Sequence, residues 1–312
     1  MNRLYSKTYI LKIIVYIFLS TFVVDKIIYF TLENISNQVF SGKAVGKLNH
    51  FLKIKDNVDL LFFGSSRAEH HIDPQLISNK AFNMGKADTH IAYASTLIKT
   101  LSNKEQLILI HIDPHDAFDS KYAAKDINRL NVKYNQNEII KNEIKKINPY
   151  NLNDFYWSLD YNSLILGILR NYITPRYNHH NFFGYSGGLD IRAEAEFKKI
   201  IDNSPKKECN ENFYINNYYK IYLDDIKKIS ENQNKTIVIY SSPIFIDYCK
   251  KDNLIFKKVM KEMNFQYYDF TDIFKDNENI SYWMDRTHLS KIGAKKFTEI
   301  IYKEIDQFKI LK

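Results

Sequence analysis

Five short apolar runs constrain the fold of this chain more than any other feature of the sequence. Several of them lead directly into glycine or polar residues, which is typical of buried parallel strands that end in loops. A helical pattern at residues 91–101 lies between the second and third runs. Strands that alternate with helices predict an α/β fold, with a parallel sheet covered by helices on both faces. The five runs are residues 58–64, 81–84, 106–112, 236–240 and 265–270.

The composition excludes several classes of protein. A chain of 312 residues with 45% hydrophobic and 26% charged residues is neither disordered, nor a coiled coil, nor a multi-pass membrane protein. Its two cysteines exclude a disulfide scaffold and a four-cysteine zinc site. The net charge of +8 accompanies an excess of Lys, Asn and Ile that indicates a coding bias. We therefore do not take the charge as a sign of a nucleic-acid partner.

An apolar run near the N-terminus predicts a single membrane-spanning helix. Residues 13–24 are almost entirely apolar, and a helix over residues 9–30 would be about 33 Å long, enough to cross a bilayer. Arg3, Lys7 and Lys12 precede the run, which predicts a cytoplasmic N-terminus and an extracytoplasmic main domain. No small-x-small cleavage site follows, which favours an uncleaved anchor. The alternative is an amphipathic or buried helix at the edge of a domain.

The sequence as a whole predicts three parts. Residues 1–32 form a cytoplasmic stub and anchor, residues 33–56 a stalk or lead-in helix, and residues 57–312 the main domain. Residues 117–216 interrupt the alternation of strands and helices and are rich in Asn, Tyr and Lys. Helical patterns at 136–147 and 164–172 precede a cluster of glycines, and we expect this insertion to cap the functional edge of the sheet. The glycines are Gly184, Gly187 and Gly188.

Polar residues follow the predicted strands, and ligands of open parallel sheets bind beyond the carboxyl ends of the strands. Ser66 follows the first strand at the start of a helix, where a hydroxyl is exposed and a backbone N–H can stabilise an oxyanion. Its alternative role is to cap that helix. Asp285 and His288 supply a carboxylate and an imidazole on one short turn, before a helix that Ser290 can cap. The alternative for this pair is an ordinary surface turn.

Three segments together resemble the SGNH, or GDSL-like, hydrolase superfamily. Gly64-Ser65-Ser66-Arg67 resembles its nucleophile block, Asn83-Met84-Gly85 its second block, and Asp285-Arg286-Thr287-His288 its last block. The resemblance implies a three-layer α/β/α flavodoxin-like sandwich. It also implies that Ser66 is the nucleophile, His288 the base and Asp285 the residue that orients it. The oxyanion donors would be the N–H groups of Ser66 and Gly85.

The third block departs from the family pattern. Where the family usually has Gly-x-Asn-Asp after the third strand, this chain has Asp113-Pro114-His115-Asp116. His115 stands at the position of the Asn oxyanion donor, and a ring N–H is able to take that role. The Gly-Ser-Ser-Arg form is similar to membrane-anchored relatives that modify envelope polymers, such as the D-alanine transfer protein of teichoic acid synthesis and proteins of polysaccharide O-acetylation.

The resemblance implies a serine-dependent acyl ester hydrolase or O-acyltransferase that acts on a cell-envelope polysaccharide and needs no cofactor. Its partners would be the membrane, an acylated polysaccharide or acyl donor, and a membrane-bound acyltransferase. The alternative is a non-catalytic protein that binds glycan or assists such an acyltransferase. The missing Asn donor and the large insertion favour this alternative, and the Ser66, Asp285 and His288 set disfavours it.

Other polar residues have less specific interpretations. His111, Asp113 and His115 alternate as metal ligands on a strand would, but Pro114 interrupts the strand, so we predict no metal site. Arg67 would either bind an anionic or sugar group or pair with a neighbouring acid.

The remaining histidines and the two cysteines have more general interpretations. His180 would line an acceptor groove in the insertion, and the pairs His70-His71 and His179-His180 would lie at the surface or in loops. Cys209 and Cys249 would be able to pair in an extracytoplasmic domain, which the sequence leaves open.

Overall fold

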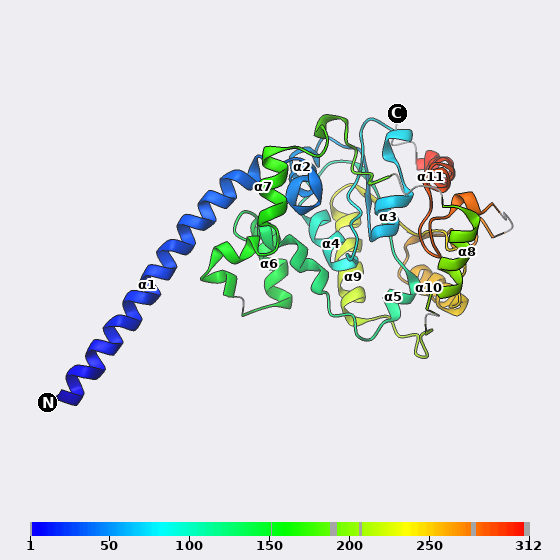
Figure 1. The fold of residues 1–312 in the computed structure, drawn as a ribbon. Coiled ribbons are helices and arrows are strands. Elements are labelled where there is room, and N and C mark those ends of the chain that lie inside the picture. The colour runs from blue at the N-terminus through cyan, green and yellow to red at the C-terminus, as the bar shows by residue number, and fades with distance from the viewer. Residues whose placement is uncertain (1, 151, 188–191, 206–207, 276–278, 309–312) are drawn as a thin grey trace. The chain divides into compact units, whose positions relative to one another are not determined.

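The computed structural model describes residues 2–150, 152–187, 192–205, 208–275 and 279–308, and Figure 1 shows it as a ribbon. The strands are β1 Leu60–Phe63, β2 Ala81–Asn83, β3 Gln106–His111, β4 Lys235–Ser241 and β5 Gln266–Asp269. The first six helices are α1 Asn2–Asn37, α2 Lys47–Ile54, α3 Ser66–His71, α4 Ile91–Lys99, α5 Pro114–Phe118 and α6 Glu138–Ile147. The later helices are α7 Ile165–Ile173, α8 Glu194–Asn203, α9 Asn217–Asn232, α10 Lys250–Glu262 and α11 Lys291–Ile305.

The chain divides into two compact units. The first contains Met1–His50 and Leu130–Asn178, and therefore α1, α6 and α7. The second contains Phe51–Arg129 and His179–Lys312, and therefore the whole sheet and every strand end that the sequence analysis singles out. The central part of the predicted insertion thus belongs to the unit that contains α1.

The five strands form one parallel sheet in the order β2-β1-β3-β4-β5. This confirms the predicted α/β class and the parallel sheet. The strands β1, β2 and β3 are buried along their whole length, which explains why they consist of continuous apolar runs instead of alternating patterns. The edge strand β5 is partly exposed. Because β1 and β3 are neighbours and β4 follows β3, the carboxyl ends of these three strands lie side by side.

One face of the sheet packs against α11. The apolar side of this helix presents Ala294, Phe297 and Ile301, and all three side chains are buried. They belong to the same core cluster as alternate residues of three strands, which is the pattern expected when one face of each strand points into one core. Elsewhere in the unit, α9 contacts both α4 and β4. The residues of these three strands in the cluster are Leu60, Phe62, Leu107, Leu109, Val238 and Tyr240, and Ala81 of β2 joins them.

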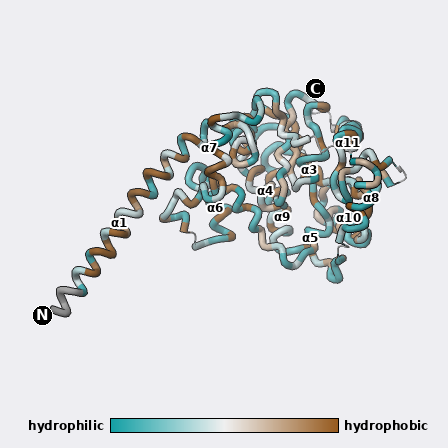
Figure 2. The backbone as a smooth tube through the Cα atoms, in the orientation of Figure 1, coloured by the Kyte–Doolittle hydropathy of each residue, from teal (hydrophilic) through white to brown (hydrophobic). Residues whose placement is uncertain are grey.

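The N-terminal helix α1 runs from Asn2 to Asn37, longer than the predicted anchor because no proline or glycine interrupts the sequence before Asn37. Its stretch from Lys7 to Asn37 is long and apolar enough to cross a membrane, and only 11% of its most apolar window is buried. This exposure is the opposite of what a buried core helix would show. Figure 2 shows the hydrophobic residues along the length of α1. The sequence therefore correctly predicts an apolar helix of spanning length.

The helices of the insertion agree with the sequence patterns. The predicted helices at 136–147 and 164–172 correspond to α6 and α7. Asn137 caps α6 by accepting a hydrogen bond from the Ile140 N–H. Of the three glycines of the predicted cluster, Gly188 lies outside the described residues. Gly184 has a positive φ of 86°, and a Cβ there would meet the Asn83 carbonyl oxygen at 2.0 Å, so only glycine fits beside the end of β2.

Candidate active site

The structure brings Ser66, His288 and Asp285 into one hydrogen-bonded line. The Ser66 Oγ lies 2.9 Å from His288 Nε2, although the two residues are 222 positions apart in the sequence. On the other side of the ring, Nδ1 lies 2.9 Å from Asp285 Oδ2. An ionised carboxylate only accepts, so Nδ1–H donates to Asp285 and leaves Nε2 to accept the Ser66 hydroxyl proton. This is the tautomer that a general base for a serine nucleophile requires.

The turn that carries Asp285 and His288 orients the carboxylate before it meets the ring. An antiparallel bridge between Trp283 and Leu289 closes the turn. Asp285 Oδ1 accepts the backbone N–H groups of Thr287 at 2.7 Å and His288 at 2.9 Å. Burial alone would raise the pKa of the Asp285 carboxyl, but the hydrogen bond and charge of His288 and the two backbone N–H groups lower it well below its ordinary value. Asp285 therefore stays ionised while it holds His288.

The N-terminal cap of α3 is Ser65 and not Ser66. Ser65 is the N-cap of α3, and its Oγ accepts the Arg67 N–H. This leaves the Ser66 hydroxyl for His288, so the capping alternative for Ser66 does not describe the structure. As the first residue of α3, Ser66 also has a backbone N–H that the helix's own ladder does not use. Gly64 makes this turn possible, since a Cβ at its φ of 136° would meet the His111 Cβ at 2.6 Å.

A buried histidine contacts the turn that carries Asp285 and His288. His71 is fully buried, so the prediction that it lies at the surface or in a loop is wrong. The reason is its place on the inner face of α3, four residues after buried Arg67 and three after buried Ala68. Its Nε2 accepts the Leu289 N–H at 3.1 Å, and its ring meets the His288 ring edge to face. Burial, with the nearby Arg67 charge, lowers the pKa of His71 well below its ordinary value.

Arg67 connects the ends of three strands. Its side chain is only 4% exposed. One guanidinium nitrogen lies 2.9 Å from Asp113 Oδ2, just after β3, and another donates to the Ser242 carbonyl at 2.5 Å, just after β4. Arg67 itself follows β1 on α3. Of its two predicted roles, this arrangement matches pairing with a neighbouring acid, and sugar or anion binding by Arg67 stays a prediction.

The second predicted oxyanion donor, Gly85, already has an acceptor in the structure. Its N–H donates to Asn83 Oδ1 at 2.8 Å, so donation to a substrate requires this hydrogen bond to open. Asn83 is held in turn through its side-chain amide, which donates to the carbonyl groups of Ala68 and Ile72. A Cβ at Gly85 would meet the Glu69 nitrogen at 2.5 Å, so glycine lets this loop approach α3 closely.

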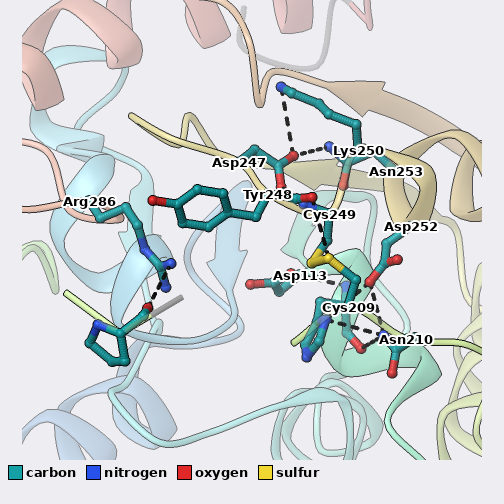
Figure 3. The surroundings of a disulfide bond; sticks show 12 residues. Asp113, Cys209, Asn210, Asp247, Tyr248, Cys249, Lys250, Asp252, Asn253 and Arg286 are labelled. Atoms are coloured by element: carbon teal, nitrogen blue, oxygen red, sulfur yellow. Dashed lines mark hydrogen bonds and ion pairs between the residues drawn. A yellow bond between two sulfur atoms is a disulfide. The ribbon is translucent and has the colours of Figure 1, made fainter. Parts of the chain in front are cut away.

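His115 lies in α5 and takes part in a different network, which Figure 3 shows around the disulfide. Its Nδ1 lies 3.1 Å from Asp252 Oδ2, and the Asn210 amide donates both to that carboxylate and to the His115 carbonyl. Asp252 only accepts, so in the tautomer that donates to it the neutral His115 ring carries its proton on Nδ1, whereas the Asn210 amide, 3.2 Å away, donates to Nδ1 in the other tautomer. Donation from Nε2 to an oxyanion therefore requires a second proton on the ring or the other tautomer.

Cys209 and Cys249 form a disulfide beside this network, which answers the question that the sequence leaves open. Cys249, His115 and Asp252 lie close enough to share an ion, but the Cys249 sulfur is bonded to Cys209 and is not available as a thiolate. The alternating set considered from the sequence is also divided, since His111 contacts Ser65, Asp113 pairs with Arg67, and His115 contacts Asp252. The alternating residues therefore do not converge on one point, and the set at Cys249 offers no thiolate.

A small hollow adjoins the turn that carries Asp285 and His288. It has a volume of about 50 Å³. Its lining includes Arg286 and Thr287, which lie between Asp285 and His288, together with Asp113 and His115. A hollow of this volume has room for more than one water molecule, and therefore for a small polar group. His180 lies exposed in a 3-10 turn with its ring tilted by 34° against that of His179, and its groove-lining role stays a prediction.

Comparison with known proteins identifies no family for this chain. No protein-family model matches the chain, and no curated protein matches its sequence.

The cap assignment leads to a first prediction about neighbouring serines. We expect Ser65→Ala to lower the free energy of unfolding by about 0.5–2 kcal/mol, because it removes the cap of α3. Ser66→Ala should cost less, since its hydroxyl caps nothing. Urea unfolding of both variants beside the wild type measures the difference. Equal destabilisation by the two substitutions would contradict the assignment of the cap to Ser65.

The buried histidines lead to a prediction about pH. Burial lowers the pKa of His71 and of His111 well below 6.5 in the folded protein. Unfolded chains take up these protons below about pH 6.5 and the folded protein does not, so stability is full above that pH and falls below it. The slope should reach about 1.4 kcal/mol per pH unit for each histidine.

The matched variant is His71→Gln, which keeps an acceptor for the Leu289 N–H and removes one titrating group. Urea unfolding at pH 7.5, 6.5 and 5.5 should show about half the wild-type slope between the two lower values. A wild type whose stability does not change over this range, or an unchanged slope in His71→Gln, would show that His71 is not held neutral.

Proposed function

We propose that this chain is a serine-dependent acyl ester hydrolase or O-acyltransferase of the SGNH type that acts on a cell-envelope polysaccharide. The observation that carries the proposal is the hydrogen-bonded line of Ser66, His288 and Asp285, with both contacts at 2.9 Å. The line joins two of the blocks on which the resemblance to the SGNH superfamily rests. Its carboxylate, imidazole and hydroxyl are in the order and tautomer that acyl transfer needs.

The proposed reaction has two halves. In the first, Ser66 Oγ attacks the ester carbonyl carbon while His288 Nε2 takes the hydroxyl proton, and the carbonyl π electrons move to oxygen. The tetrahedral intermediate collapses when His288 returns the proton to the leaving alcohol, which leaves an acyl ester on Ser66. In the second half, His288 takes a proton from water or a sugar hydroxyl, whose oxygen attacks the acyl carbon. His288 then protonates Ser66 as the acid or the new ester leaves.

The oxyanion would be held first by the Ser66 N–H at the start of α3. The Gly85 N–H would join it when the hydrogen bond to Asn83 opens. His115 would join when its ring carries a proton on Nε2. The second and third donors thus depend on a rearrangement that substrate binding would have to drive.

We also propose that the main domain is a three-layer α/β/α sandwich of the flavodoxin-like type. Two observations support it. The strand order β2-β1-β3-β4-β5 is the one that defines this doubly wound topology, and the complete burial of β1 and β3 calls for helices on both faces. In this topology the site lies at the carboxyl ends of β1 and β3, where Ser66 and Asp113 are found.

The cell envelope is the proposed location. Helix α1 has the length and apolar surface of a single-pass anchor, and Arg3, Lys7 and Lys12 at its start favour a cytoplasmic N-terminus. The Cys209–Cys249 disulfide favours an oxidising compartment outside the cytoplasm for the unit that carries the site. The substrate would be an acylated polysaccharide or a membrane-bound acyl donor, and the acyl group that the resemblance implies is a small one such as acetyl.

A second candidate is an accessory protein that holds glycan or a membrane acyltransferase without catalysis. The observation in its favour is that Gly85 and His115 both direct their donors to side chains of the protein itself. In this alternative, Ser66, His288 and Asp285 are hydrogen-bonded as observed, but the protein has no oxyanion hole in which an ester could react.

The decisive comparison is release of acetate from aryl acetates and acetylated polysaccharide by the full chain in detergent micelles. We expect Ser66→Ala and His288→Ala each to lower the turnover at least about 10³-fold relative to wild type. Removal of either the nucleophile or its base prevents the same step. The matched control is Ser65→Ala, which should keep most of its turnover per folded molecule. Turnover by Ser66→Ala equal to that of wild type, or none in wild type on any ester, would favour the accessory protein.

A further inference from the structure

An exposed apolar group lies in the first unit, beside the end of the long apolar stretch of α1. Leu152, Phe155 and Leu159 are all exposed, and Leu152 shows 70% of its surface. They come from the loops and short 3-10 turns between α6 and α7. Neighbouring residues on α1 are also exposed and apolar, so this surface continues that of the helix. The exposed α1 residues here are Val23, Val24, Ile27, Ile28 and Phe30.

Hydrogen bonds hold this segment against α1 at one level. The Asp25 carboxylate accepts the N–H groups of Trp157 and Ser158 and the Ser158 hydroxyl, at 2.9, 3.0 and 2.5 Å. Lys26 donates to the Phe155 carbonyl and lies 4.0 Å from the centre of the Trp157 ring. The segment is therefore attached to α1 through both members of the only acidic–basic pair in its apolar part.

The position of this attachment along α1 is close to where the bilayer would end. Residues 13–24 carry no charge, and Asp25 and Lys26 follow them. The Tyr156 hydroxyl reaches Thr21 Oγ1, at 3.4 Å. Thr21 precedes Asp25 by four residues, which is about 6 Å along a helix toward the uncharged stretch. The contact with Thr21 therefore places Tyr156 beside the uncharged stretch of α1, on the membrane side of Asp25 and Lys26.

The residue types match those found where proteins meet the edge of a bilayer. Tryptophan, tyrosine and lysine gather at the headgroup level, because each has an apolar body and a polar tip. Here Trp157, Tyr156 and Lys26 surround the boundary, with leucine and phenylalanine exposed beside them. The buried Asp25 is satisfied by the segment itself, so its charge does not prevent this level from meeting lipid.

We propose that residues 152–159 lie in the extracytoplasmic leaflet of the membrane that α1 crosses, with Leu152, Phe155 and Leu159 among the upper acyl chains. The partner is the lipid bilayer, chosen because the apolar surface is continuous with that of a helix of spanning length. The segment gives the first unit a second attachment to the membrane. The proposal rests on the membrane placement of α1 and not on the chemistry of Ser66.

Spin labels on the full chain in nanodiscs of phosphatidylethanolamine and phosphatidylglycerol test the proposal. Because both native cysteines are bonded to each other, an introduced cysteine is the labelling site, and wild type serves as the blank. Leu152→Cys and Leu159→Cys probe the segment. The matched control is Leu254→Cys on α10, whose parent residue is 65% exposed. Val24→Cys reports whether α1 itself is in lipid.

We expect labels at Leu152→Cys and Leu159→Cys to collide at least about threefold more with oxygen, which concentrates in lipid, than with a water-soluble nickel chelate. Leu254→Cys should show the reverse. The two probe sites keep the test valid if one substitution disturbs folding.

Nickel accessibility at both probe sites equal to that of Leu254→Cys would overturn the proposal. If Val24→Cys is then in lipid, the anchor stands and the segment faces water or a protein partner that the nanodisc lacks. If Val24→Cys is also in water, the membrane placement of α1 fails together with the proposal. Neither result depends on the esterase assay, so the two proposals are tested separately.

Discussion

The buried guanidinium of Arg67 is the interaction on which the site depends. A charge with only 4% exposure is costly unless it is paired, and Arg67 is paired with Asp113 and with the Ser242 carbonyl. These partners follow β3 and β4, and Arg67 follows β1, so one side chain holds three strand ends at a fixed separation. Ser66 precedes Arg67 on the same helix turn, and the pairing therefore fixes the hydroxyl as well.

The opposite half of the candidate site is positioned by hydrogen bonds of His71 and of two backbone N–H groups. His71, from the same short helix as Ser66, accepts the Leu289 N–H and thereby ties α3 to the turn that carries Asp285 and His288. The turn holds Asp285 ionised through two of its own backbone N–H groups. The hydrogen bond between His71 and Leu289 thus joins the helix of Ser66 to the turn of His288, although the two segments are far apart in the sequence.

Much of this arrangement is readable from local sequence patterns. Continuous apolar runs predict the five strands because burial on both faces leaves no polar alternation, and the rule that sites follow strand ends selects Ser66 and Asp113. The roles of His71 and the pairing of Cys209 with Cys249 are not readable, because they depend on distances between segments far apart in the chain. The exposure of Leu152, Phe155 and Leu159 likewise depends on how the chain packs. The polar residues between them break the apolar pattern, so the sequence does not predict this surface.

The central claim is that Ser66 is an activated nucleophile. It is tested most directly by incubating the full chain with a fluorophosphonate and locating the adduct by peptide mass mapping. The account predicts one adduct, on Ser66, that is lost in Ser66→Ala and much slower to form in His288→Ala, because the hydroxyl needs its base. An adduct on another serine, or the absence of any adduct in a folded wild-type protein whose Ser66 is accessible, would contradict it.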